Sequence, residues 1–151
     1  MSVVVDRAAD EVYAAIADEH ELMQWSAWPQ ATGYTCAVQG DGTSVGSNIV
    51  FTDAAGIEQG RQQLVRTEPG KLVEYRLTNR GLRGRTMRPE VGFRIETITA
   101  QRTTVHLDFR NDVPLPQPAR LLVDRLLGHR VRALHVADLR QLKAFVEQTQ
   151  R

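Results

Sequence analysis

Cysteine and histidine are both scarce in this chain of 151 residues. The single cysteine, Cys36, excludes an intramolecular disulfide and any metal site built from several thiolates. The four histidines, His20, His106, His129 and His135, show none of the spacings typical of metal ligands. We therefore expect neither a metal nor another cofactor, and we interpret Cys36 as a packed side chain.

Long apolar runs are also missing. No stretch approaches the ~20 apolar residues that a membrane helix requires, and the N-terminus lacks the charged-then-apolar plan of a signal peptide. The length and the 42% hydrophobic content fit one domain over residues 1–151. These features predict a cytoplasmic protein without a membrane span. They leave the oligomeric state open, a homodimer included.

Basic residues are rare early in the chain and frequent later. Residues 1–60 contain nine acids and one base, whereas residues 61–151 contain nine acids and eighteen bases. Five arginines fall within RLTNRGLRGRTMR (76–88), which has no acidic residue. Such a cluster can bind nucleic acid, frame a pocket for an anion or keep a hairpin solvated, and the last role is the commonest. RNA recognition would need interleaved aromatic side chains, and none lies between Tyr75 and Phe93, so we expect no nucleic-acid partner.

The hydrophobic pattern changes period twice along the chain. A short strand at 3–5 is followed by helices at about 8–18 and 20–25, after which Pro29 opposes helix in the residue before it. From 34 to 111 the pattern mainly alternates, which indicates about six antiparallel strands with one apolar and one charged face. Residues 118–148 return to the helical period and predict a long helix that covers the apolar face.

This order of elements, together with two segments, resembles the START-like (SRPBCC) superfamily of polyketide cyclase/dehydratase and lipid-transport-like proteins. VDRAADEVYAAIADEHELMQW (5–25) resembles the family's opening, with a tryptophan at Trp25, and LVRTEPGKLVEYRL (64–77) resembles its central hairpin. The resemblance implies an α+β helix-grip fold with the order β-α-α-β6-α. In that fold a curved antiparallel sheet wraps around the long C-terminal helix and leaves a cavity for a hydrophobic molecule.

A carboxylate interrupts the apolar stripe of the predicted last helix. Steps of three and four residues give Leu127, Val131, Leu134, Asp138, Leu142 and Phe145. His135 lies one turn before Asp138, so the two side chains can approach each other. One interpretation makes them polar anchors or an acid/base pair in the cavity, and the other pairs Asp138 with a structural arginine such as Arg61 or Arg94.

The resemblance also places the arginine-rich hairpin at the mouth of the cavity, where it would suit a ligand with an acidic head group. The expected rim is Arg80, Arg83 and Arg85. The expected ligand-binding residues are Trp28, Tyr75, Phe93, Phe109, Leu127, Val131, Leu134, His135 and Asp138.

Three functions fit this sequence. The first is non-catalytic binding of a hydrophobic or amphiphilic small molecule, lipid or polyketide-like, in the cavity. The second is an enzyme of cyclase, aromatase or dehydratase type that uses His135 and Asp138 as its candidate catalytic pair. The third is a protein-interaction module whose apolar groove receives a partner segment.

Overall fold

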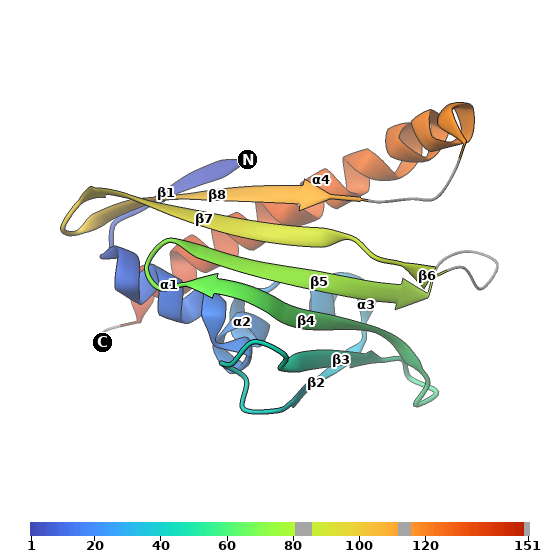
Figure 1. The fold of residues 1–151 in the computed structure, drawn as a ribbon, viewed down its shortest axis with the longest axis horizontal. Helices are drawn as coiled ribbons and strands as arrows, with labels where there is room; N and C mark the ends of the chain where they lie inside the picture. Colours follow the sequence, from blue (N-terminus) through green and yellow to red (C-terminus); the bar gives the residue numbers. More distant parts are fainter. Residues whose placement is uncertain (81–85, 112–115, 150–151) are drawn as a thin grey trace.

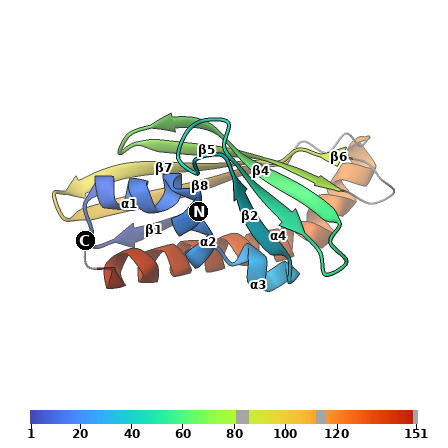
Figure 2. The same ribbon diagram turned by 90° about the horizontal axis from the view of Figure 1, so that it is seen from below.

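The structure is a computed structural model that describes residues 1–80, 86–111 and 116–149, and for Val123, Asp124 and Leu127 it describes the backbone alone. Its main feature is an antiparallel eight-stranded sheet that curves over a long C-terminal helix (Figures 1 and 2). The α+β helix-grip fold expected from the sequence is therefore confirmed.

Eight strands form the sheet in the order β1-β8-β7-β5-β4-β3-β2, with β6 paired to β5. Breaks in register, which bend a sheet, occur at Phe51/Thr52, Leu64/Arg66 and Thr97/Thr99. The strands are β1 (Ser2–Val5), β2 (Thr35–Gln39), β3 (Asn48–Thr52), β4 (Glu58–Glu68), β5 (Leu72–Arg80), β6 (Thr86–Met87), β7 (Glu90–Thr99) and β8 (Arg102–Arg110).

Three short helices connect β1 to β2, one more than the sequence analysis predicts. α1 spans Ala9–Ala17, α2 spans Glu19–Trp25 and begins where the Asp18 carboxylate accepts the His20 N–H at 2.8 Å, and α3 spans Trp28–Thr32. The expectation that Pro29 opposes helix at Trp28 was wrong, because a proline in the first turn removes an N–H that has no helical partner there. Gly33, with φ of 70°, ends α3.

The C-terminal helix α4 spans Gln117–Gln148, 32 residues, and crosses the concave face of the sheet (Figure 2). Its C-terminal turns lie near β1 and α1, and its N-terminal turns lie toward the end of the sheet that carries β6 (Figure 1). The predicted apolar stripe is only partly right. Among the described side chains of α4, the buried ones are His135, Asp138, Leu139, Leu142 and Val146, whereas Leu134 and Phe145 are half-buried.

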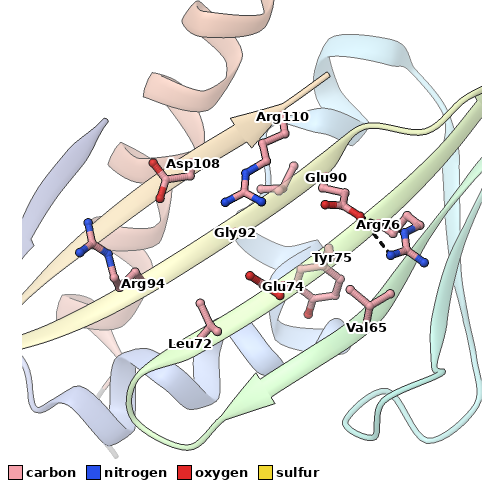
Figure 3. A pocket seen from close by; sticks show the side chains of 11 residues that line it. Val65, Leu72, Glu74, Tyr75, Arg76, Glu90, Gly92, Arg94, Asp108 and Arg110 are labelled. Carbon is pink, nitrogen blue, oxygen red and sulfur yellow. Dashed lines mark hydrogen bonds and ion pairs between the residues drawn. The ribbon is translucent and has the colours of Figure 1, made fainter. Parts of the chain in front are cut away.

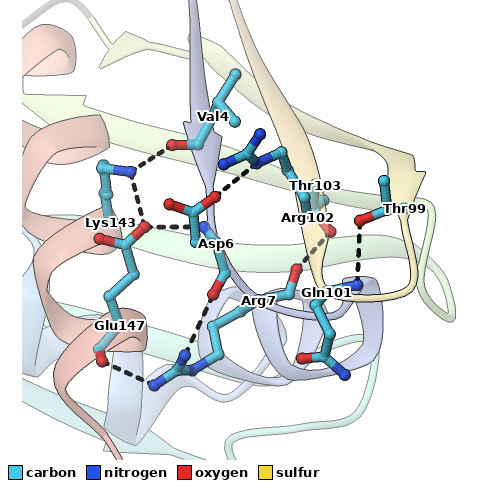
Figure 4. A network of polar contacts seen from close by, with 9 residues as sticks. All are labelled: Val4, Asp6, Arg7, Thr99, Gln101, Arg102, Thr103, Lys143 and Glu147. Atoms are coloured by element: carbon cyan, nitrogen blue, oxygen red, sulfur yellow. Dashed lines mark hydrogen bonds and ion pairs between the residues drawn. The ribbon is translucent and has the colours of Figure 1, made fainter.

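A polar network ties the C-terminal turns of α4 to the β1 edge (Figure 4). Lys143 Nζ donates to the Val4 carbonyl at 2.7 Å and pairs with Glu147, whose carboxylate accepts the Asp6 N–H at 2.8 Å. Although partial burial raises it, the Asp6 N–H and the Lys143 ammonium hold the pKa of Glu147 below its usual value. Arg102 in turn pairs with Asp6 at 2.6 Å. This end of the helix is therefore held by side chains as well as by apolar packing.

Candidate functional site

A cavity of about 190 Å³ lies between the sheet and α4. Its walls come from the link between α2 and α3, from the inner face of β4, β5, β7 and β8, and from the middle of α4. Most of the lining is apolar or aromatic. The lining residues are Leu22, Trp25, Ser26, Trp28, Gln62, Leu77, Asn79, Met87, Pro89, Val91, Phe93, Phe109, Asn111, Val131, Leu134, His135 and Asp138.

Most of the predicted ligand-binding residues are brought together at this cavity. Trp28, Phe93, Phe109, Val131 and Leu134 all line it, as do His135 and Asp138. The side chain of Leu127 lies outside the described part of the structure. Tyr75 does not line this cavity, because its fully buried hydroxyl donates to the Ile16 carbonyl at 2.8 Å in the packed core.

Asp138 joins α4 to the link between α2 and α3. Its Oδ1 atom accepts the Ala27 N–H at 2.7 Å and the Ser26 hydroxyl at 3.3 Å. Neither of the two suggested arginines is its partner, since Arg61 pairs with Glu58 at 2.5 Å and Arg94 projects from the outer face of the sheet (Figure 3). A backbone amide thus takes the place that an arginine partner would have filled. This explains how a carboxylate can sit in an apolar stripe.

His135 is 7% exposed and lies between Asp138 and an aromatic ring. Its Nδ1 atom is 3.6 Å from Asp138 Oδ2, within ion-pair range but longer than a hydrogen bond, and its ring centroid is 4.8 Å from that of Phe109. Neither ring nitrogen has a hydrogen-bond partner. The histidine therefore keeps hydrogen-bonding capacity at the cavity wall.

The two tryptophans have different surroundings. Trp25 is 3% exposed, packs edge-on against Phe93 with ring centroids 6.1 Å apart, and donates from Nε1 to the Ala15 carbonyl at 2.8 Å. Trp28 is half-buried against Phe51, and its Nε1 atom is buried without a partner. Both line the cavity, but only Trp28 has a hydrogen bond still to make.

Four polar lining residues were not among the predicted site residues: Ser26, Gln62, Asn79 and Asn111. Two of them continue an alternating apolar series that the sequence shows. Asn79 follows Val73, Tyr75 and Leu77 at the next inward position, and Asn111 follows Phe109 in the same way. Alternation extended by one more step would have placed both on the inner face.

The predicted arginine rim is not part of the described cavity wall. Arg80 is exposed on β5 and lies close enough to the β3–β4 hairpin to help lower the pKa of two carboxyls. For Asp53 the main cause is the Ile57 N–H, and for Glu58 it is the hydrogen bond from Arg61. Arg83 and Arg85 lie outside the described residues.

The outer face of the sheet carries a second, charged depression of about 430 Å³ (Figure 3). Gly92 forms its floor because it has no side chain, opposite Glu74 on β5 and Asp108 on β8. Arg76 and Glu90 pair across it at 3.0 Å. Exposed pairs of this kind contribute little to stability, so we interpret this face as the solvated side that the alternating sequence predicts.

The described part of the chain was also searched for metal sites and for membrane-spanning helices. No group of three or more His, Cys, Asp and Glu side chains is arranged there to hold a metal ion. No helix within the described ranges is long and apolar enough to cross a membrane.

Comparison with known proteins agrees with this architecture. Residues 1–147 match the family described as polyketide cyclase / dehydrase and lipid transport. The chain belongs to this family. Its fold is one that binds small hydrophobic ligands. A comparison with curated protein sequences found no match to the chain.

Solved structures confirm the fold of this polyketide cyclase / dehydrase and lipid transport family member. A conserved protein from Geobacillus kaustophilus has a TM-score of 0.70 at 12% identity, with 99% of this chain and 95% of that chain covered. Norcoclaurine synthase from Thalictrum flavum, in complex with dopamine and hydroxybenzaldehyde, has a TM-score of 0.69 at 12% identity, with 100% and 87% covered. A Chromobacterium violaceum protein has a TM-score of 0.64 at 17% identity, with 99% and 96% covered.

Proposed function

We propose that this protein binds a small hydrophobic or amphiphilic molecule in the cavity between the sheet and α4. The observation that carries the proposal is the cavity itself, about 190 Å³ with mostly apolar and aromatic walls. Protein interiors are close-packed, so a hollow of this size with polar groups in its wall suits a guest. The family description is consistent with such a guest.

A variant pair on α4 tests the proposal. Leu134→Trp would fill the cavity from its wall, whereas Leu126→Trp adds the same bulk at a side chain that is 65% exposed. Native mass spectrometry after gentle purification should show a small-molecule mass on the natural protein and on Leu126→Trp, but not on Leu134→Trp. If no such mass is retained and no compound of a lipid and ring-compound panel binds, the proposal is wrong.

A second candidate function is catalysis of cyclisation or dehydration. The observation that favours it is the His135 imidazole at the cavity wall, 3.6 Å from a carboxylate that can orient it. A histidine so placed can accept and return a proton. The norcoclaurine synthase of similar fold shows that this architecture also supports an enzyme.

The enzyme candidate is separated from the carrier by one variant. His135→Ala should abolish turnover of a cyclisable hydroxy-ketone while the compound still binds. If the compound binds and is returned unchanged by the natural protein, the carrier is supported.

A further inference from the structure

The polar atoms in the cavity wall indicate the class of ligand. We propose that the cavity selects an uncharged compound of one or two rings that carries hydroxyl or N–H groups and at least one acceptor oxygen, and that it rejects carboxylates. This rests on the proposed function and narrows it. It also replaces the acidic head group that the arginine-rich hairpin suggests in the sequence.

The charge of the wall argues against an anionic guest. None of the described lining residues is a lysine or an arginine, and the ionisable groups among them are His135 and Asp138. A carboxylate placed in this cavity would lose its hydration without gaining a cationic partner, and it would face the carboxylate of Asp138. An uncharged guest avoids both costs.

Hydrogen bonds still to be made are concentrated at the cavity. Within the described residues, five buried side-chain polar atoms have no partner, and four of them belong to lining residues: Trp28 Nε1, Asn111 Oδ1, and His135 Nδ1 and Nε2. Native proteins pair nearly all their buried polar atoms. Three lining residues of one cavity break this rule, and a guest that supplies hydrogen-bond partners best explains them.

The types of these atoms define what the guest must offer. The Trp28 N–H can only donate, so it needs an acceptor oxygen, and Asn111 Oδ1 needs a donor. His135 Nδ1 faces Asp138 Oδ2 at 3.6 Å, which favours the proton on Nδ1 and leaves Nε2 as an acceptor. The matching guest therefore provides two donors and one acceptor, as a dihydroxylated ring does.

The volume of the cavity indicates how large the enclosed part of the guest can be. A dry protein cavity of about 150 Å³ holds a benzene molecule, and ligand pockets for larger compounds commonly exceed about 300 Å³. At about 190 Å³, this cavity can enclose one or two fused rings, whereas a long acyl chain would have to extend through its open mouth. The rings of Phe93 and Phe109 in the wall suit a flat guest.

Matched probes test the proposal by calorimetric titration. The set is naphthalene, 2-naphthol, 2,7-dihydroxynaphthalene, 2-naphthoate and laurate. We expect the diol to bind tightest, about tenfold tighter than naphthalene for two added hydrogen bonds, with 2-naphthoate and laurate weakest. If 2-naphthoate, laurate or naphthalene binds as tightly as the diol, the ligand class is wrong and the proposed function stands. If none of the five binds the folded protein, the ligand class is also wrong, and the retained mass and the wider panel described above decide the proposed function separately.

Variants of the wall then assign the selectivity to residues. His135→Leu and Asn111→Leu each remove an acceptor, and each should reduce the preference for the diol over naphthalene by about two- to tenfold. Gln101→Leu is the control, because it also replaces an amide by a leucine, but at an exposed residue of the β7–β8 turn that does not line the cavity. An equal loss of preference in all three variants would show that the loss does not come from the acceptors of His135 and Asn111.

Discussion

The two ends of the space between the sheet and α4 differ in whether their buried polar atoms have hydrogen-bond partners. At the packed end, around Ile16, Tyr75 and Leu142, all three side chains are fully buried and the Tyr75 hydroxyl has a carbonyl partner at 2.8 Å. At the cavity end, four buried polar atoms, which belong to Trp28, Asn111 and His135, have no hydrogen-bond partner. We infer that one end of the sheet and helix mainly stabilises the fold, and that the other end holds the proposed ligand.

The same contrast runs along α4. Its last turns bury Leu139, Leu142 and Val146 and are held by Lys143 and Glu147 (Figure 4). Its first turns leave Leu121, Leu122 and Leu126 between 59% and 66% exposed. We infer that α4 is anchored at its C-terminal end, and that its N-terminal part is the less constrained wall of the fold.

The largest difference is expected from truncating one leucine at each end. Leu142→Ala should lower the free energy of unfolding by about 2–5 kcal/mol, because Leu142 is fully buried and leaves a new cavity. Leu134→Ala should cost about 1 kcal/mol, because this half-buried side chain already borders a hollow. Urea denaturation measures the unfolding free energy of both variants. Equal losses would show that the cavity end is packed as tightly as the other.

The next effect concerns the carboxylate between the two ends. Asp138→Ala leaves the Ala27 N–H without its acceptor and should cost about 1–3 kcal/mol in thermal or urea unfolding. Asp138→Asn keeps an acceptor oxygen and should cost less. If the two variants lose the same amount, the negative charge and not the acceptor holds this junction.

A smaller difference in unfolding free energy is expected between variants of two buried polar side chains, Tyr75 and His135. Tyr75→Phe removes the hydrogen bond to the Ile16 carbonyl and should cost about 1 kcal/mol. His135→Leu removes two unpartnered nitrogens and should leave the unfolding free energy within about 0.5 kcal/mol, or raise it. The unfolding free energies of the two variants can be compared by urea denaturation of the ligand-free protein. A large loss in His135→Leu would reveal a structural role for the imidazole.

The smallest effect depends on pH and on Glu19, a buried carboxylate outside the cavity. Burial raises its pKa, although the Ser47 hydroxyl donates to it at 2.6 Å. A raised pKa in the folded state stabilises the protein fully below the unfolded value of 4.5, and this contribution is lost as the pH rises through the folded value. The stability of the natural protein relative to Glu19→Gln should therefore fall as the pH rises above 4.5. A constant difference between the two proteins over that range would contradict the prediction.

Local patterns in the sequence predicted most of the helices and strands and several residues of the cavity wall. Alternation places Phe93 and Phe109 on the inner face, and the helical period places His135 and Asp138 together. The same patterns missed α3, since a proline is unfavourable within a helix but acceptable in its first turn. They also did not identify Asn79 and Asn111, which occupy the next inward position after Leu77 and Phe109.

Periodicity along the chain, which depends only on neighbouring residues, was enough to indicate an antiparallel sheet covered by a long helix, whereas the curvature of the sheet was implied by the family resemblance. The partner of Asp138 could not be obtained in this way, because the Ala27 amide is 111 residues away and no charge marks it. The same holds for the unpartnered atoms of Trp28, Asn111 and His135. Whether a buried polar atom is satisfied depends on distances between segments remote in the chain, which are known only once the sheet, the helix and the link between α2 and α3 are packed together.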